Sequence, residues 1–155
     1  MNFAKPARLL LFLGAIGLIF SGCDLFEQRD RTFDDDPKVE FFPLSEVVDE
    51  GEGTVTTNVQ LIGPQRDSDL QLNFTVDDSS TAVEGTHYEL NSSSATISAN
   101  SSSAPVSINV LDNSQDDGGT NYQLYLTLEG SSGVEPAENL KTYTLTIRGV
   151  DESGT

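Results

Sequence analysis

Apolar and polar side chains alternate along most of the chain after residue 50. A period of two is typical of a β-strand with one face against a core and the other face in water. Five runs show this alternation clearly: residues 55–61, 70–76, 106–110, 122–128 and 143–147. Two weaker runs cover residues 38–48, which Pro43 interrupts, and a short stretch around residues 96–97. The pattern therefore predicts seven short strands.

Turn-forming residues separate the predicted strands. Gly-Pro stands at 63–64, and clusters of Asn, Asp, Ser and Gly occupy residues 77–80, 91–93, 100–102, 113–119 and 130–133. No eleven-residue stretch after residue 22 carries a convincing helical period. Short strands with regular turns indicate an all-β fold, a single immunoglobulin-like antiparallel β-sandwich of about seven strands over residues 38–150. The chain has one Cys and no Trp, so it is not an antibody-type domain.

The first 22 residues read as a signal peptide. Lys5 and Arg8 precede an apolar run of 12 residues at 9–20, which is too short for a membrane-spanning helix of about 20 residues. The following stretch, Ile19-Phe20-Ser21-Gly22-Cys23, resembles the lipobox of bacterial lipoproteins. The resemblance implies cleavage before Cys23 and acylation of that residue, which would anchor the protein in a lipid bilayer. The alternative is an ordinary secretory signal with a Cys just past the cut.

Residues 23–37 read as the lipidated Cys followed by an acidic flexible tether. The segment 24–37 is polar, has no apolar period, and contains six acidic residues and two arginines. Charge repulsion should keep such a segment extended. Asp24 resembles an inner-membrane retention signal of enterobacterial lipoproteins, or part of a surface-export signal of Bacteroidota-like lipoproteins, and we expect the outer membrane of a bacterial envelope. We expect residues 151–155 to form a C-terminal tail.

The charge balance narrows the possible functions. With 25 acidic and 8 basic side chains, the formal net charge is −17, which disfavours nucleic-acid binding. One Cys and one His leave no Cys/His zinc site and no disulfide framework to expect. The sequence has no P-loop and no G-x-S-x-G motif, and the lone histidine, His87, has no readable triad partner. We therefore expect a protein that is not an enzyme and requires no cofactor.

Several short motifs occur in an order that resembles the Calx-beta family. Val48-Asp49-Glu50-Gly51-Glu52-Gly53 matches its opening V-x-E-G-x-G turn. The stretch Thr81-Ala82-Val83-Glu84-Gly85-Thr86-His87-Tyr88 matches T-A-x-x-G-x-D-Y. Val110-Leu111-Asp112-Asn113 matches an I-x-D-D loop that leads to a strand beginning near Tyr122. This resemblance implies the same β-sandwich, and it places Tyr88 and Tyr122 at one end of it, where we expect them to pack in the core.

Some Calx-beta domains bind Ca²⁺ through clustered carboxylates at one end of the sandwich. The resemblance implies that Glu50 and Asp112 keep acidic ligands, while Asp117 keeps a carboxylate on a shorter side chain. His87, Asn113 and Thr120 replace an Asp, an Asp and a Glu, and Arg148 stands where an acidic run is common. Because Ca²⁺ takes six to eight oxygen ligands, these losses predict weak binding at best.

We expect a non-catalytic, lipid-anchored envelope lipoprotein that presents its sandwich to a protein or polysaccharide partner. One alternative is a calcium-binding Calx-beta-type module. Another is a carbohydrate-binding module, although only Tyr125 among the predicted strand residues offers an outward aromatic ring for sugar stacking.

Overall fold

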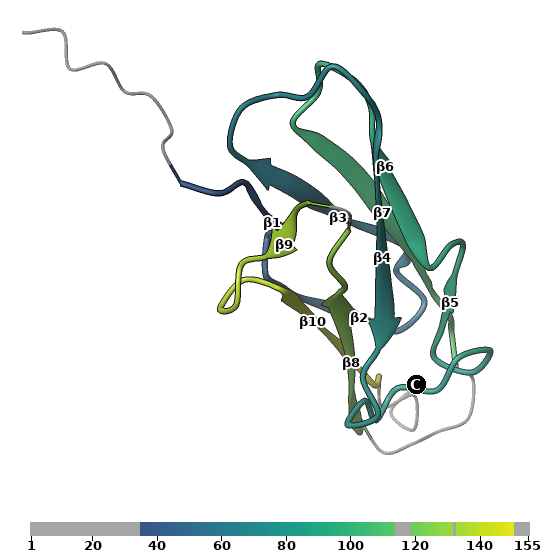
Figure 1. Ribbon diagram of the computed structural model, residues 1–155. Coiled ribbons are helices and arrows are strands. Elements are labelled where there is room, and N and C mark those ends of the chain that lie inside the picture. Colours follow the sequence, from purple (N-terminus) through teal and green to yellow (C-terminus); the bar gives the residue numbers. More distant parts are fainter. Residues whose placement is uncertain (1–34, 114–118, 132, 151–155) are drawn as a thin grey trace, which may run out of the picture. The chain divides into compact units, whose positions relative to one another are not determined.

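The computed structural model describes residues 35–113, 119–131 and 133–150. The chain divides into two compact units, Met1–Thr32 and Phe33–Thr155, and the described residues all belong to the second unit. They form strands and connecting loops (Figure 1). Within these ranges, no helix is long and apolar enough to cross a membrane.

Ten strands of the described residues make two sheets of five strands each. The first sheet has the order β5-β7-β3-β1-β9, with β5 at Tyr88–Leu90, β7 at Ser103–Val110, β3 at Gly53–Ile62, β1 at Lys38–Phe42 and β9 at Glu135–Pro136. The second has the order β2-β10-β8-β4-β6, with β2 at Ser45–Asp49, β10 at Thr142–Arg148, β8 at Asn121–Leu128, β4 at Leu70–Val76 and β6 at Ser94–Ile97. The predicted all-β, immunoglobulin-like sandwich is confirmed.

The core lies between the two sheets and is filled by the apolar residues of the alternating runs. In β4, Leu70, Leu72 and Phe74 are buried while Gln71 and Asn73 are exposed. Aromatic rings contact one another between the two sheets: the ring centroid of Phe41 of β1 lies 6.2 Å from that of Phe74 of β4 and 5.9 Å from that of Tyr143 of β10. Such tilted and edge-on contacts add to the stabilisation that burial alone provides.

The chain changes sheets at Pro43. β1 pairs with β3 in the first sheet, and β2 pairs in parallel with β10 in the second. The Phe42–Pro43 peptide bond is cis. The fully buried Thr57 of β3 donates from its hydroxyl to the Pro43 carbonyl at 3.0 Å. The hydroxyl of Thr57 therefore has a partner, which explains a polar residue on the apolar side of β3.

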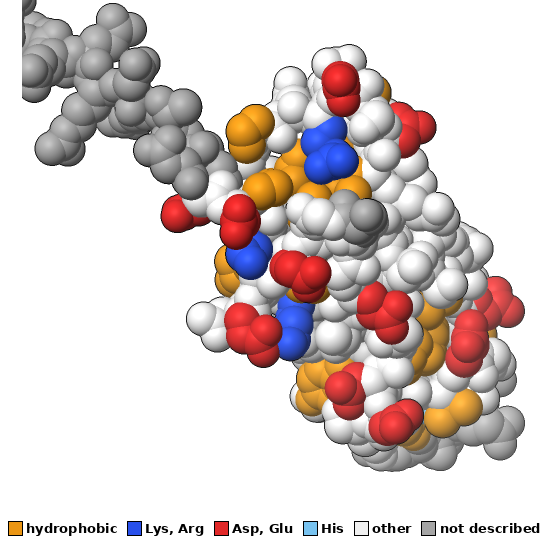
Figure 2. Space-filling view, in the orientation of Figure 1, with side chains coloured by type: hydrophobic (Ala, Val, Ile, Leu, Met, Phe, Trp, Pro, Cys, Tyr) orange, Lys and Arg blue, Asp and Glu red, His pale blue; other side chains and the backbone are white. Residues whose placement is uncertain are grey.

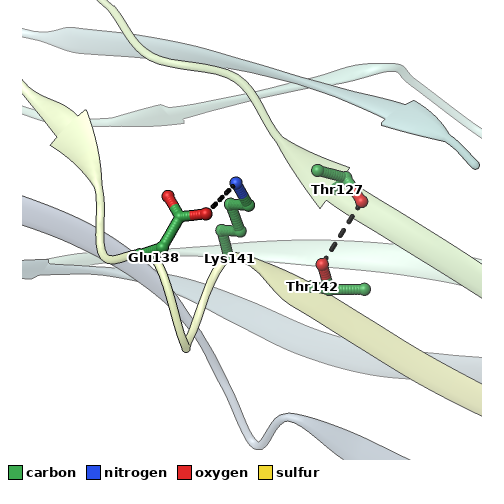
Figure 3. Close-up of polar contacts among 4 residues, drawn as sticks. All are labelled: Thr127, Glu138, Lys141 and Thr142. Atoms are coloured by element: carbon green, nitrogen blue, oxygen red, sulfur yellow. Dashed lines mark hydrogen bonds and ion pairs between the residues drawn. The ribbon is translucent and has the colours of Figure 1, made fainter.

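Cross-strand side chains mark the register of β8 and β10. Thr127 and Thr142 are register partners, and their hydroxyl oxygens lie 3.3 Å apart (Figure 3). Just before β10, Lys141 Nζ lies 2.9 Å from Glu138 Oε1 in the turn that follows β9. The backbone carbonyl of Lys141 also accepts from the N–H of Leu128 at 2.9 Å. These contacts fix the position of the chain where β10 begins, next to β8.

The predicted strands agree with the structure except in number. The run at 38–48 is two strands in different sheets, separated at Pro43. β5 and β9 were not predicted as strands. They contain three and two residues, which is too short for an alternating pattern to be recognised, and they exist only because β7 and β1 offer edges for pairing.

Candidate functional site

The predicted ligand positions lie in loops at one end of the sandwich. At this end β2 and β7 finish, at Asp49 and Val110, and β3 and β8 begin, at Gly53 and Asn121. We call it the Asp112 end and define it by residues 49–52, 83–87, 111–113, 119–120 and 148–150. It contains Glu50, Asp112, His87, Asn113 and Thr120. Asp117 and Cys23, also predicted as site residues, lie outside the described residues.

Glu50 is engaged by the backbone of the neighbouring loops. Its N–H donates to the carbonyl of Arg148 at 2.9 Å, and its Oε1 accepts from the N–H of Val150 at 2.6 Å. A carboxylate that accepts from a backbone N–H forms a strong, charge-assisted hydrogen bond. Glu50 therefore holds the segment after β10 against the turn between β2 and β3, and a metal ion would have to share or displace this contact.

Asp112 is exposed and lies beside Gly51 of the same turn. The N–H of Gly51 donates to the Leu111 carbonyl at 3.1 Å. Gly51 has a φ of 73°, and a Cβ there would lie 3.4 Å from the Cβ of Asp112. The positive φ, which favours glycine, is the backbone requirement that lets the two loops meet.

His87 fills the position where the resemblance implies an acidic ligand. Its side chain is buried, and its Nδ1 accepts from the backbone N–H of Val83 at 2.8 Å. The imidazole lies 3.8 Å from the ring of Tyr122 between centroids, with 32° between the planes. The His87 carbonyl accepts from the N–H of Leu111 at 3.0 Å. These contacts make His87 a packing residue that connects its own loop to β8 and to the segment that follows β7.

A positively charged side chain, that of Arg148, lies beside an acidic residue of the Asp112 end. Arg148 at the end of β10 forms an ion pair with Asp49 at the end of β2, with 2.8 Å between Nη2 and Oδ1. Both side chains are about half exposed, so the pair contributes only about 0–1 kcal/mol to stability. Its positive charge nevertheless reduces the negative potential that would attract a divalent cation to this end.

The described residues do not make a complete calcium site. Among the three described ranges, no group of three or more His, Cys, Asp or Glu side chains is placed to hold a metal ion. Glu50 and Asp112 remain as carboxylates at family ligand positions. Thr120 is exposed, and its carbonyl accepts from the N–H of Gly149 at 2.9 Å. Two carboxylates fall well short of the six to eight oxygens that Ca²⁺ requires.

Tyr88 and Tyr122, expected to pack in the core, differ in depth. Tyr88 is buried, and burial together with the nearby Glu84 raises the pKa of its hydroxyl. Tyr122 is half-buried and packs against the core and His87. Both rings therefore help to close the Asp112 end.

A pocket that the sequence did not indicate lies away from the Asp112 end. This pocket of about 340 Å³ is lined by six residues: Arg66, Asp69, Leu70, Gln71, Asn73 and Ser131. Arg66 belongs to the loop between β3 and β4, and Ser131 follows β8. The only signal in the sequence was an arginine in a turn of a strongly acidic chain, and nothing there predicts that Arg66 meets Asn73 and Ser131.

Comparisons with known proteins agree with this architecture. The apo form of the Calx CBD1 domain has a TM-score of 0.65 and 20% identity, over 76% of this chain and 100% of that one. The calcium-binding domain CBD12 of CALX1.1 has a TM-score of 0.63 and 21% identity, over 74% of this chain and 45% of that one. A Bacteroides ovatus protein whose name proposes carbohydrate binding has a TM-score of 0.56 and 13% identity, over 73% and 37%.

At these identities the structural matches show the fold alone. No curated protein matches the sequence. The model of the Calx-beta domain, however, matches residues 33–149, which is most of the chain. The motif order found in the sequence, the two-sheet architecture and this match agree, and the chain belongs to the Calx-beta family.

Proposed function

We propose that this protein is a non-catalytic lipoprotein of the bacterial cell envelope, anchored through acylated Cys23, that presents its Calx-beta sandwich to a protein or polysaccharide partner. The observation that carries the proposal is the position of the chain's single Cys, directly after Ile19-Phe20-Ser21-Gly22 and an apolar run of 12 residues. Two or three acyl chains on one residue make an anchor that does not readily release.

The anchored arrangement suits a domain made for contact. The acidic segment 24–37 lies between Cys23 and β1, which begins at Lys38. In the domain, the polar groups of the Asp112 end are used in packing: His87 accepts from Val83, and Glu50 accepts from Val150. A rigid sandwich whose loops face water is a common platform for recognition, and function on such folds resides in loops and grooves.

Phase partitioning of the full-length protein, expressed in a bacterium that processes lipoproteins, tests the anchor. The wild-type protein should enter the detergent-rich phase of a Triton X-114 extract. The Cys23→Ser variant should remain in the aqueous phase, and a Ser21→Ala variant, which keeps a small residue in the lipobox, should behave like the wild type. A wild-type protein that stays in the aqueous phase would overturn the proposal.

Calcium binding is the second candidate function, and the carboxylates of Glu50 and Asp112 at one end favour it. The calcium-binding CBD12 structure supports it only through the shared fold. In this chain the described ligands are too few for tight binding, so we propose at most a weak site, in the millimolar range of extracellular modules. Calcium titration of the wild type and of Asp112→Ala, followed by thermal unfolding, tests this candidate.

A further inference from the structure

The pocket beside Arg66 lies where the second sheet is incomplete. β8 pairs with β4 only at Phe74–Val76, and the N–H of Glu129 then donates to the Asn73 carbonyl at 2.9 Å. β8 ends at Leu128, so β4 continues toward Leu70 beyond the end of its neighbour. The backbone N–H and C=O groups of Gln71 point toward the same edge of β4 as those of Asn73, because alternate residues of a strand direct their backbone groups to the same edge. The pocket occupies this gap.

Arg66 brings an unused hydrogen-bond donor to the pocket. Its Nε is buried and has no hydrogen-bond partner in the structure. The two ion pairs found among the described residues join Lys141 to Glu138 and Arg148 to Asp49, so Arg66 takes part in neither. A buried donor without a partner is unfavourable in a folded protein, and a bound water or ion can satisfy it. The guanidinium fork matches the two oxygens of a carboxylate or sulfate group.

The loop that carries Arg66 is held in place from the next connection. The Arg66 carbonyl accepts from the N–H of Asn100 at 2.7 Å, and Asn100 has a φ of 60°. The Asp69 carboxylate accepts from the N–H of Ala99 through Oδ1 at 2.8 Å. Two contacts between the 63–69 and 98–102 loops therefore position Arg66 and Asp69 before any ligand arrives, which lowers the cost of ordering them on binding.

The remaining lining residues suit a ligand rich in hydroxyl groups. Gln71 and Asn73 each offer an amide that can both donate and accept, and Ser131 offers a hydroxyl. Asp69 retains a second carboxylate oxygen as an acceptor. Leu70 is the one apolar residue that lines the pocket, and it is buried in the core. Such a polar lining fits sugar hydroxyls better than an apolar peptide side chain.

We propose that this pocket binds a saccharide unit that carries an acidic substituent, with the guanidinium of Arg66 on the acidic group and the amides of Gln71 and Asn73 on the hydroxyls. The proposal rests on the polysaccharide arm of the proposed function. Acidic side chains are spread over the face shown in Figure 2, and basic ones are few. With a net charge of −17, the protein should repel a dense polyanion. The pocket therefore selects one acidic sugar unit within a largely neutral polysaccharide.

Isothermal titration calorimetry of the full-length protein in detergent tests the Arg66 pocket with three probes. These are an oligosaccharide with one hexuronic acid residue, the same oligosaccharide with its carboxyl reduced to an alcohol, and a neutral oligosaccharide with one sulfate ester. The hexuronate probe should bind at least about tenfold more tightly than its reduced counterpart, since a charge-assisted pair is lost on reduction. Tight binding of the sulfate probe also supports the acidic-group claim and identifies sulfate as a second acceptable source.

Matched variants locate the binding. Arg66→Gln should weaken hexuronate binding about tenfold or more, and Arg66→Lys, which keeps the charge and the buried stem, should lose most of the same affinity because the planar fork is gone. Arg148→Gln removes one positive charge at the Asp112 end and should leave affinity within about twofold. Thermal unfolding of each variant shows that the domain is folded.

Equal binding of the hexuronate and its reduced counterpart, or an unchanged affinity in both Arg66 variants, would overturn the proposal. So would the absence of binding by all three probes. Because phase partitioning of the same preparation reports on the Cys23 anchor separately, failure of the saccharide site is distinguishable from failure of the proposed function.

Discussion

The Nδ1 atom of His87 accepts a hydrogen bond from the backbone N–H of Val83 at 2.8 Å. The two residues bracket the turn that contains Gly85, and the N–H of His87 returns a hydrogen bond to the Val83 carbonyl at 2.9 Å. The resemblance to the Calx-beta family implies an acidic metal ligand at position 87. Here it carries a buried ring that packs on Tyr122. A position associated with metal binding therefore has a structural role in this chain.

Replacing His87 with alanine should destabilise the domain by about 1–3 kcal/mol. The substitution leaves the Val83 N–H without its partner and removes the contact with Tyr122. Urea unfolding followed by circular dichroism measures the loss. Thr86→Ala, at an exposed neighbour in the same turn, is the control and should change the unfolding free energy by no more than about 0.5 kcal/mol. Equal effects of the two substitutions would contradict the packing role of His87.

Calcium should stabilise the wild-type domain only slightly. If the dissociation constant is in the millimolar range, about 1 mM Ca²⁺ adds roughly 0.4 kcal/mol, which raises Tm by about 1–3 °C. The double variant His87→Asp/Asn113→Asp returns two carboxylates to family ligand positions, and its Tm should respond more strongly to Ca²⁺ than that of the wild type. Asp112→Ala should abolish the response in either background. A wild-type increase of about 5 °C or more at 0.1 mM Ca²⁺ would show that the site is far stronger than two described carboxylates suggest.

Gly51→Ala should cost about 1–2 kcal/mol, because an L-residue is strained at a φ of 73°. Gly53→Ala is the control that separates the cost of backbone strain from the cost of a new side-chain contact. Gly53 also has a positive φ, of 85°, but a Cβ there would meet nothing within 4 Å. The new Cβ at Gly51 would lie 3.4 Å from Asp112, an ordinary contact distance. The two variants should therefore lose similar unfolding free energy in chemical denaturation. A much greater loss for Gly51→Ala would mean that loop packing against Asp112, and not backbone conformation, sets the requirement.

Stability should fall as the pH rises above about 10. Tyr143 is fully buried and donates to Glu46 Oε2 at 3.4 Å. Burial, and then Glu46, raise the pKa of Tyr143 above its usual value. The unfolded chain ionises this tyrosine near pH 10, while the folded chain holds the proton, so the stabilising difference is present below pH 10 and is lost above it.

Unfolding free energies measured between pH 8 and pH 11 test this pH dependence. Tyr143→Phe should flatten the decline, and the remaining slope should include Tyr88, whose pKa burial also raises. Thr144→Val, at a residue of β10 next to Tyr143 whose side chain does not ionise in this range, should leave the slope unchanged. The same decline in all three proteins would exclude Tyr143 as its source.

The fold could be predicted because its long strands are regular. In β3, buried residues alternate with more exposed ones along the strand, and only a strand with one face on a core imposes that period. The pairing of β5 and β9 could not be predicted from two or three residues. It depends on the free edges of β7 and β1, which exist only once the sheets have formed.

The two sites differ in how far the sequence reveals them. Glu50, His87 and Asp112 were found through short motifs that fix a turn or a strand end, and the structure places all three at the Asp112 end. Their uses could not be predicted, since Glu50 accepts from Val150, a hundred positions away. The Arg66 pocket left no motif, because its lining comes from two loops and a strand that meet only where β8 ends.

Intact-mass measurement of the mature protein, purified in detergent from a lipoprotein-processing bacterium, tests the central claim most directly. We predict a chain that begins at Cys23 and carries the added mass of a diacylglycerol, with or without an N-terminal acyl chain. A mature chain of unmodified mass, or one that begins at any other residue, would contradict it.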